Sequence, residues 1–229
     1  MNIKDLTLEE KLTLLCGKNG WTTETCGGKV PEIRVSDGPH GLRLVLKVED
    51  GKEVSADATA MPSLSVVANG WNKLAAHEQG GTIADDCADN GVDVLLAPGV
   101  NVKKTPLCGR NFEYFSEDPY LAGTLAAEYI SGVQSRGVGA CLKHFCANNV
   151  ESDRSWQSSE VDERTLNEIY LKPFEIALKA KPWTVMCSYN PINGVYASEN
   201  KKMLADVLRK RLGFDGLVMS DWGAVHNGY

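Results

Sequence analysis

Charged and hydroxyl side chains follow the apolar runs of this sequence at the points where strands would end. Asp221 comes directly after the run 217–220, Lys143 and His144 end a second run, and Tyr189 follows a third. A carboxylate in such company can act as a nucleophile, while cationic and hydroxyl groups can bind the hydroxyls of a neutral substrate. Because parallel α/β barrels keep their active sites at the carboxyl ends of their strands, we expect these side chains to share one rim.

Three further residues belong to the same predicted rim. Asp37 follows an early apolar run and can accept hydrogen bonds from two sugar hydroxyls, and Arg110 follows another run and can donate them. Trp222 offers a flat apolar face on which a sugar ring can stack. Each residue alone also has a plain structural explanation; Asp221, for example, could cap the next helix. Their shared place at strand ends favours a functional site, because a solvated surface has no reason to follow strand ends.

The elements that must position these residues are apolar strand-like runs that alternate with helical patterns. We predict strands near residues 33–36, 64–68, 92–97, 138–143, 183–188 and 217–220. We predict helices over residues 7–16, where Thr7 and Glu10 form a capping box, and over residues 72–89, 118–134, 162–180 and 198–212. This alternation is typical of a parallel sheet with helices outside it, and we predict a (β/α)8 TIM-type barrel of the α/β class.

The predicted barrel is incomplete at its C-terminal end. A full eight-stranded barrel needs about 250 residues, whereas this chain has 229 residues and six predicted strands. An open barrel leaves strand edges and apolar faces uncovered, so we expect the isolated chain to be poorly soluble or oligomeric. No linker interrupts the sequence, and we assign residues 1–229 to one domain with a polar surface loop at residues 47–57.

Composition argues against several other classes of protein. Lys and Arg number 24 and Asp and Glu number 30, and the net charge of −6 disfavours a nucleic-acid or anionic-membrane partner. No apolar run approaches the roughly 18 residues of a membrane span, and the acidic N-terminus does not resemble a signal peptide, which predicts a cytoplasmic protein. The 7 scattered cysteines fit reduced, buried thiols, and neither they nor the 4 histidines show metal-ligand spacing. We therefore expect no metal and no cofactor.

Five motifs in a fixed order carry a family resemblance that covers nearly the whole chain. They are Val35-Ser-Asp-Gly-Pro-His-Gly-Leu-Arg43, Gly109-Arg-Asn-Phe-Glu-Tyr-Phe-Ser-Glu-Asp-Pro119, Lys143-His-Phe145, Met186-Cys-Ser-Tyr-Asn190 and Val218-Met-Ser-Asp-Trp-Gly223. On these motifs the chain resembles the N-terminal barrel domain of glycoside hydrolase family 3, and most of all that of bacterial β-glucosidases. The run from Val207 to Asp221 is similar to the active-site signature of that family throughout.

The resemblance implies a role for each candidate residue. It makes Asp221 the nucleophile of a retaining mechanism, in which two carboxyl groups about 5–5.5 Å apart work through a covalent glycosyl-enzyme. The residues that it implies for binding the glycone, the sugar unit that is transferred, are Asp37, Arg110, Lys143, His144 and Tyr189, with Met186 and Trp222 lining the same subsite. It implies hydrolysis of terminal, non-reducing β-D-glucosyl or related residues.

One departure from the family pattern concerns the general acid/base. In most of the family it is a glutamate on a second, α/β-sandwich domain, which these 229 residues do not contain. The rest of the barrel and the acid/base domain are therefore expected in cis or in trans. The N-acetylglucosaminidase branch instead carries an Asp-His pair after the Lys-His-Phe motif, but residues 146–154 contain no histidine. Glu151 or Asp153 could stand in as the acid, and Arg154 would order this loop or contact the glycone.

Two functions from different classes remain open on the sequence. The first is the nucleophile barrel of a β-glucosidase-type hydrolase, whose glycone the sequence does not separate among glucose, xylose and galactose. The alternative is a non-catalytic carbohydrate-binding or assembly module derived from the same barrel, which the missing second carboxylate supports. The retained Asp221 and the full glycone-binding set oppose that alternative, because a module that only binds has no need of a nucleophile.

Overall fold

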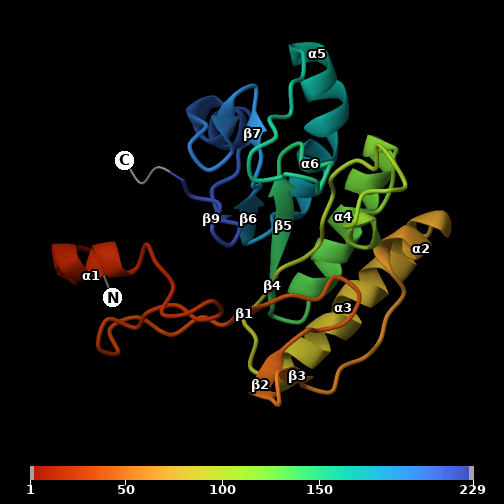
Figure 1. The fold of residues 1–229 in the computed structure, drawn as a ribbon. Coiled ribbons are helices and arrows are strands. Elements are labelled where there is room, and N and C mark those ends of the chain that lie inside the picture. The colour runs from red at the N-terminus through yellow and green to blue at the C-terminus, as the bar shows by residue number, and fades with distance from the viewer. Residues whose placement is uncertain (1–2, 227–229) are drawn as a thin grey trace.

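A sheet of five parallel strands organises residues 3–226, which are the residues that the computed structural model describes (Figure 1). The strands lie in the order β1-β4-β5-β6-β9, and each pair of neighbours is parallel. Their bounds are β1 Val35–Ser36, β4 Val94–Leu95, β5 Gly139–Phe145, β6 Thr184–Cys187 and β9 Leu217–Ser220. The predicted α/β class with a parallel sheet is thus confirmed, while a (β/α)8 TIM-type barrel that is incomplete in this chain stays a prediction.

Helices follow the strands and begin at side-chain caps that the sequence signals. Thr7 forms a capping box with Glu10, and Asn72, Asp118 and Asp162 each accept a hydrogen bond from a backbone N–H of the first turn. The longer helices are α3 Lys73–Asp89, α4 Pro119–Gln134 and the π-helix η5 Lys202–Arg211, and the shorter ones are η1 Ile3–Asp5, α1 Leu8–Thr13, α2 Leu64–Asn69, η2 Asn111–Glu113, α5 Glu163–Thr165, η3 Leu166–Tyr170, α6 Lys172–Ala177 and η4 Leu178–Ala180.

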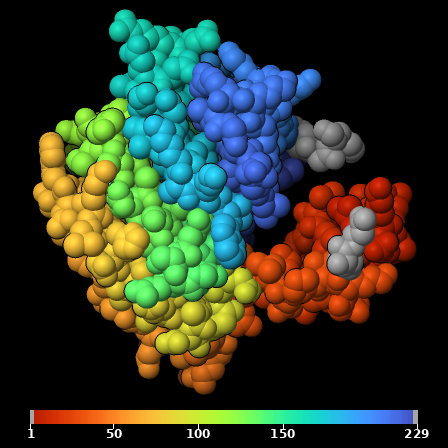
Figure 2. Space-filling view, turned by 180° about the vertical axis from the view of Figure 1, so that it is seen from behind, coloured from red at the N-terminus to blue at the C-terminus, as the bar shows by residue number. Residues whose placement is uncertain are grey.

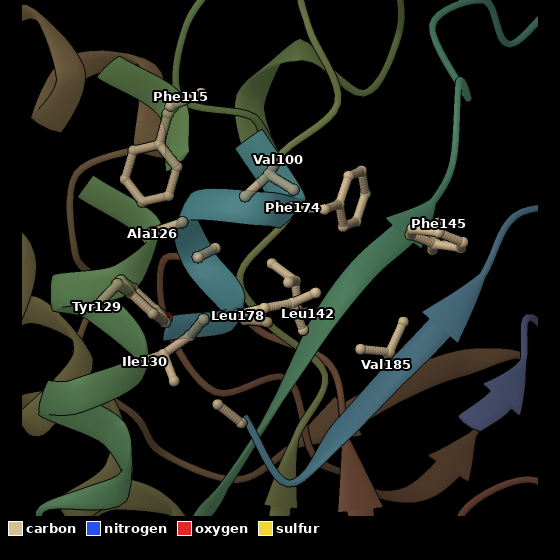
Figure 3. Packing of buried hydrophobic residues seen from close by; sticks show 14 of the residues in the cluster. Val100, Phe115, Ala126, Tyr129, Ile130, Leu142, Phe145, Phe174, Leu178 and Val185 are labelled. Atoms are coloured by element: carbon tan, nitrogen blue, oxygen red, sulfur yellow. The ribbon is translucent and has the colours of Figure 1, made fainter. Parts of the chain in front are cut away.

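The main core fills the space between one face of the sheet and helices α3, α4 and α6 (Figure 3). Leu142 and Val185 point from the strands toward Tyr129 and Ile130 of α4, and all four are fully buried. Phe145 meets Phe174 of α6 edge to face, with ring centroids 5.1 Å apart. This layer holds the strands in place, so that the residues at their carboxyl ends keep fixed positions.

Glycines let the helices approach one another closely. A Cβ atom at Gly80 of α3 would lie 2.3 Å from the carbonyl oxygen of Tyr129, and one at Gly132 of α4 would lie 2.0 Å from that of His77. Neither distance is physically accessible to a side chain, so α3 and α4 pack backbone against backbone at these two points.

The opposite face of the sheet carries a second, smaller apolar cluster. Val94, Leu96, Cys141 and Met186 form it, and Met219 packs against them. These residues alternate along the strands with the residues of the main core, as expected for strands with a period of two. This inner face ends at the carboxyl edge of the sheet, where Met186 also lines a pocket.

The segment before β1 lies to one side of the sheet (Figure 1), and Figure 2 shows it as a lobe beside the main body. Backbone hydrogen bonds tie it to the strand region, from Thr23 N–H to the carbonyl of Ile33 and from Val35 N–H to the carbonyl of Trp21. Helix α1 has no buried residue. Among residues 3–226, no helix has the length and apolar character that a membrane crossing needs.

The strand predicted at residues 64–68 is wrong, because these residues form helix α2. The buried side chains are Leu64, Val67 and Ala68, at the i, i+3, i+4 spacing of a helix, while Val66 faces solvent. A short apolar run fits either element by composition, and the helical spacing within it was the deciding signal. The other five predicted strands are confirmed to within a few residues.

The loop predicted at residues 47–57 is also wrong in part. The strands β2 Val45–Glu49 and β3 Lys52–Ser55 pair antiparallel there. Asp50 and Gly51 both have positive φ angles of 49° and 74°, which a tight hairpin turn requires. The hairpin lies on the surface as predicted, and its many charged residues concealed the strand pattern. A second small hairpin joins β7 Pro191–Ile192 to β8 Val195–Tyr196.

Two predicted helices have different ends in the structure. The helix expected over residues 7–16 ends at Thr13, and the one expected over residues 198–212 begins at Lys202. The pattern over residues 162–180 divides into α5, η3, α6 and η4, with Pro173 near the start of α6. A proline cannot donate the backbone hydrogen bond of a helix interior, which accounts for a break in one regular α-helix at this place.

Candidate active site

A pocket of about 200 Å³ opens at the carboxyl edge of the sheet. Its lining contains all nine residues that the sequence analysis proposed for the site, namely Asp37, Arg110, Lys143, His144, Arg154, Met186, Tyr189, Asp221 and Trp222. The tenth lining residue, Trp21, was not predicted. The structure therefore brings the whole predicted set together, and the role of each residue stays a prediction.

Strand ends deliver most of these side chains. Asp37 follows β1, Tyr189 follows β6 by two residues and Asp221 follows β9 directly. The parallel register aligns Met186 with Met219, so that the loops after β6 and β9 begin at the same level. Arg110 comes from the long connection after β4, which Gly99 ties to Lys143 by a parallel bridge. Residues far apart in the sequence thus meet because the strands that carry them end at one edge.

Lys143 and His144 both reach the pocket although they are consecutive residues of β5. Neighbouring side chains of a regular strand point to opposite faces, but the pairing of β5 with β6 shifts register between Lys143 and Phe145. The side chain of Asn101 fixes the backbone there, because its amide donates to the carbonyl of His144 at 3.0 Å and accepts the N–H of His144 at 2.9 Å.

Glu113 joins the two cations of the pocket wall. Its carboxylate accepts a hydrogen bond from Nε of Arg110 and lies 3.0 Å from Nζ of Lys143, which is also 3.5 Å from Asp37. Burial would raise the pKa of Glu113, but Lys143 and Arg110 outweigh it and hold that pKa below its usual value. Burial would lower the pKa of Lys143, but Glu113 and Asp37 outweigh it and raise that pKa. The buried pair is therefore ionised.

His144 is fully buried and neutral. Burial lowers its pKa well below the usual value, and the positive charges of Arg110 and Lys143 lower it further. Nη2 of Arg110 lies 2.7 Å from Nε2 of His144, and a guanidinium can only donate, so Nε2 is the acceptor. The ring proton therefore sits on Nδ1, which donates to the hydroxyl of Tyr114 at 3.0 Å. Two neighbours thus select one tautomer.

The two carboxylate oxygens of Asp221 have different surroundings. Oδ1 accepts the backbone N–H of Trp222 at 2.8 Å, which orients the group. Oδ2 is buried and has no hydrogen-bond partner among the described residues. Nη1 of Arg110 lies 3.7 Å from Oδ2 and places a positive charge beside it. One oxygen is thus anchored, and the other is left available inside the pocket.

Arg154 stacks on Tyr189 at the side of the pocket, with its guanidinium carbon 4.1 Å from the ring centroid. Glu151 holds it there by accepting a hydrogen bond from Nη1 at 2.7 Å, and Glu151 also accepts one from Asn148 at 3.2 Å. Burial and the neighbouring Asp221 carboxylate raise the pKa of Tyr189 to about 12, so its hydroxyl keeps its proton. Glu151 does not line the pocket.

Two tryptophans form a wall of the pocket. The rings of Trp21 and Trp222 are tilted by 39° with centroids 5.4 Å apart. Nε1 of Trp222 donates to the carbonyl of Gly20 at 2.9 Å, a bond that spans 202 positions of the sequence. The N-terminal segment therefore contributes directly to the site.

Sequence reasoning missed Glu113, Tyr114 and Trp21. Glu113 lies three residues after Arg110, a spacing at which opposite charges often pair, and this signal could have identified it. Tyr114 adjoins it in the same motif. Nothing near Trp21 in the sequence relates it to Trp222, because only the folded chain brings them together.

Among residues 3–226, no group of three or more His, Cys, Asp or Glu side chains could hold a metal ion.

Comparison with known proteins shows which proteins this chain is similar to. Residues 22–228 match the family model described as "Glycosyl hydrolase family 3 N terminal domain". Among curated proteins, thermostable beta-glucosidase B of Acetivibrio thermocellus is 50% identical over 98% of this chain, and an exo-alpha-(1->6)-L-arabinopyranosidase of Bifidobacterium longum is 49% identical over 99% of it. The chain spans 30% of the length of each of these relatives.

Solved structures agree with these sequence matches. A beta-glucosidase of Bifidobacterium adolescentis superposes with a TM-score of 0.91 and 47% identity, and the alignment covers 98% of this chain and 32% of that one. Beta-glucosidase 3B of Thermotoga neapolitana, solved in complex with glucose, superposes with a TM-score of 0.88 and 44% identity, covering 96% of this chain and 33% of that one.

Proposed function

Because this chain belongs to glycosyl hydrolase family 3, we propose that it provides the nucleophile and the glycone pocket of a retaining β-glucosidase-type enzyme. Oδ2 of Asp221 attacks the anomeric carbon, and the bond from that carbon to the leaving-group oxygen breaks. A general acid protonates the departing oxygen. Water then attacks the same carbon, gives a proton to the acid/base residue and releases Asp221.

The state of the Asp221 carboxylate is the single observation that carries this proposal. A nucleophile needs a free lone pair, a fixed direction and nearby charge that stabilises the reacting group. The backbone N–H of Trp222 orients Oδ1, Arg110 stands 3.7 Å from Oδ2, and Oδ2 itself has no hydrogen-bond partner among the described residues. A carboxylate that served only to cap a helix would use both oxygens as acceptors or face solvent, whereas Asp221 is 6% exposed.

The groups around Asp221 suit a substrate with many hydroxyls. Asp37 supplies acceptors, Lys143 and Arg110 supply donors, and Tyr189 can do both with its protonated hydroxyl. Several of these groups pair with one another, as Lys143 does with Asp37 and Arg110 with Asp221, so a sugar exchanges one set of polar contacts for another. Such exchange gives orientation and specificity more than raw affinity.

The general acid in this proposal lies outside the described residues. Among the residues that the structure describes, the only carboxyl group besides Asp221 that lines the pocket is Asp37, and it is 3.5 Å from Nζ of Lys143. Glu151 is held by Arg154 and Asn148, and neither it nor the exposed Asp153 lines the pocket. Since the relatives are about three times as long as this chain, their further length offers room for a second domain with the acid.

The glycone in this proposal is a β-D-glucosyl residue. Relatives named as beta-glucosidases support glucose, and the relative named as an arabinopyranosidase shows that a close sequence can serve a pentose. A panel of aryl glycosides decides between them.

Covalent labelling tests the nucleophile without requiring the general acid. The chain is treated with 2,4-dinitrophenyl 2-deoxy-2-fluoro-β-D-glucoside, whose leaving group departs as the phenolate and needs no proton. We expect a stable ester on Asp221, found by mass spectrometry of the intact protein and of its peptides, and one equivalent of dinitrophenolate. The corresponding α-L-arabinopyranoside is tested in parallel.

A matched pair of variants provides the control. Asp221→Asn should abolish labelling, while Asp215→Asn, an exposed aspartate six positions earlier, should not change it. Label on another residue, or equal labelling of Asp221→Asn, would exclude Asp221 as the nucleophile. A folded protein that binds phenyl β-D-glucoside but never forms the ester would instead favour a sugar-binding module.

A further inference from the structure

We propose that Glu151 is a positioning residue, which fixes the guanidinium of Arg154 against Tyr189 and thereby sets how tightly the pocket binds a sugar. This inference rests on the proposed function, because it concerns the same pocket. The ligand class is a neutral sugar, whose hydroxyls can accept the N–H donors of an arginine. Glu151 itself does not line the pocket, so it acts on the sugar only through Arg154.

A tight turn at residues 151–154 brings the two side chains together. The backbone N–H of Arg154 donates to the carbonyl of Glu151 at 3.4 Å, and Asp153 has a positive φ angle of 52°. Nη1 of Arg154 donates to Oε2 of Glu151 at 2.7 Å, and the two side chains are 35% and 19% exposed. Because water reaches this charge-assisted hydrogen bond only in part, it holds its geometry better than a fully exposed ion pair does.

The second carboxylate oxygen of Glu151 ties this pair to the buried part of the site. Oε1 accepts a hydrogen bond from Nδ2 of Asn148 at 3.2 Å, and the same nitrogen lies 3.4 Å from the hydroxyl of Tyr114. Asn148 and Tyr114 are both buried, and Tyr114 in turn contacts His144. Both oxygens of Glu151 are therefore engaged, and the residue links the partly exposed Arg154 to side chains with fixed positions.

Arg154 keeps most of its hydrogen-bond donors for a ligand. A guanidinium carries several N–H donors, and within residues 3–226 only Glu151 accepts one from Arg154. One face of the guanidinium is covered by Tyr189, with the central carbon 4.1 Å from the ring centroid. The remaining donors lie in the plane of the group. Since Arg154 lines the pocket, these donors can bind the hydroxyls of a sugar there.

Arg154 acts on binding rather than on the chemical step. Among the described residues, the positive charge within 4 Å of Oδ2 of Asp221 belongs to Arg110 and not to Arg154. A contact that is equally strong before and during the reaction lowers the dissociation constant without changing the maximal rate. If Glu151 no longer holds Arg154, the arginine must be ordered each time a sugar binds, which weakens binding by about 2- to 12-fold.

A double-mutant cycle tests whether Glu151 acts through Arg154. The dissociation constant of methyl β-D-glucoside is measured by calorimetry for wild type, Glu151→Gln, Arg154→Ala and the double variant. We expect Glu151→Gln to bind about 2- to 12-fold more weakly than wild type, and the double variant to bind no more weakly than Arg154→Ala. Asp153→Asn is the matched control, because it removes an exposed negative charge from the same turn and should bind as wild type does.

Ester formation on Asp221 gives a second readout, which a general loss of structure would not reproduce. With saturating 2,4-dinitrophenyl 2-deoxy-2-fluoro-β-D-glucoside, the maximal rate of labelling in Glu151→Gln should equal that of wild type. The concentration that gives half of this rate should rise by the same factor as the dissociation constant. Glu151→Asp keeps a carboxylate in the turn and should weaken binding less than Glu151→Gln does.

The outcomes separate the inference from the function on which it rests. Unchanged affinity in Glu151→Gln would overturn the inference, and so would a further loss when this change is added to Arg154→Ala, because Glu151 would then support the pocket independently of Arg154. Failure of the folded wild type to bind the glucoside also overturns it. If Glu151→Gln does not fold, Glu151→Asp takes its place in the cycle. The proposed function is judged by whether wild type forms the ester on Asp221, so the two can fail independently.

Discussion

Oδ2 of Asp221 lies 3.5 Å from Nε2 of His144, yet the two atoms share no hydrogen bond. Nε2 already accepts a hydrogen bond from Arg110, and the imidazole proton is on Nδ1 toward Tyr114. His144 is therefore a neutral neighbour that presents a lone pair to Asp221. In this tautomer His144 donates no hydrogen bond to Oδ2 of Asp221. Arg110 contacts both residues, and its Nη1 carries the only positive charge within 4 Å of Oδ2 among the described residues.

Removing the hydroxyl of Tyr114 should weaken the site by releasing the tautomer of His144. In Tyr114→Phe the Nδ1–H of His144 loses its acceptor, and a buried donor left without a partner costs about 1–3 kcal/mol. We expect ester formation on Asp221 to slow by roughly 5- to 100-fold, measured as the second-order rate constant of labelling with the fluoroglucoside. The exposed Tyr120 provides the control, since Tyr120→Phe removes a hydroxyl outside the pocket. Equal rates in both variants would contradict this account of His144.

Stability should fall on mild acidification because of His144. Its pKa in the folded protein lies well below 6.5, whereas in the unfolded chain it is near 6.5. As the pH falls below about 6.5, His144 binds a proton in the unfolded chain but not in the folded protein. The free energy of unfolding therefore decreases by up to about 1.4 kcal/mol per pH unit.

Urea unfolding at pH 7 and pH 5 measures this effect, in a window where most carboxylates are still ionised. His144→Gln should show a smaller decrease between the two pH values than wild type, while His77→Gln on α3 should decrease as wild type does. A decrease of the same size in His144→Gln would show that other groups govern the acid response.

Replacing Glu113 should be costly because this buried carboxylate lies between the buried Lys143 and the partly buried Arg110. Glu113→Gln leaves Arg110 and Lys143 near each other without it, and removal of one partner of a buried ion pair typically costs about 3–5 kcal/mol. At roughly 2–4 °C per kcal/mol for a chain of this size, we expect Tm to fall by about 6–20 °C. The exposed Glu117 is the matched control, and Glu117→Gln should change Tm by little. A Tm within error of wild type for Glu113→Gln would contradict the network.

Two adjacent glycines of α3 should respond in opposite ways to alanine. A Cβ at Gly80 would lie 2.3 Å from the carbonyl oxygen of Tyr129, while one at Gly81 would come no closer than 3.4 Å to the side chain of Arg136. Gly80→Ala forces α3 and α4 apart and should cost about 1–3 kcal/mol or more. Gly81→Ala should be neutral or stabilising by up to about 1 kcal/mol, because alanine favours a helix. Thermal unfolding of the two variants compares them, and equal Tm values would show that the helices separate without cost.

The local elements of this fold were largely predictable from the sequence. Five of six predicted strands and the caps at Thr7, Asn72, Asp118 and Asp162 follow from patterns within a few residues of one another. The errors arose where local patterns were ambiguous. The run 64–68 is too short for its composition to distinguish a strand from a helix. In the hairpin at residues 45–55, charged lysine and glutamate side chains obscured the alternation of apolar and polar residues that predicts a strand.

The membership of the pocket was also predictable in large part, because parallel strands end at one edge and carry their following residues with them. This rule places Asp37, His144, Tyr189 and Asp221 together without any knowledge of their contacts. The sequence by itself thus determined which strand-end side chains meet. It did not determine how they pair, since a hydrogen bond or an ion pair depends on distances of a few tenths of an ångström.

Only the tertiary structure decided the tautomer of His144 and the hydrogen bonding of Asp221. The approach of Arg110 to Nε2 of His144 sets the tautomer, and that in turn leaves Oδ2 of Asp221 free. The contact of Trp21 with Trp222 joins residues about 200 positions apart and depends on where the folded chain places the N-terminal segment relative to the loop after β9. Contacts of this range leave no periodic signal in the sequence, because they arise from the packing of whole elements rather than from the preferences of neighbouring residues.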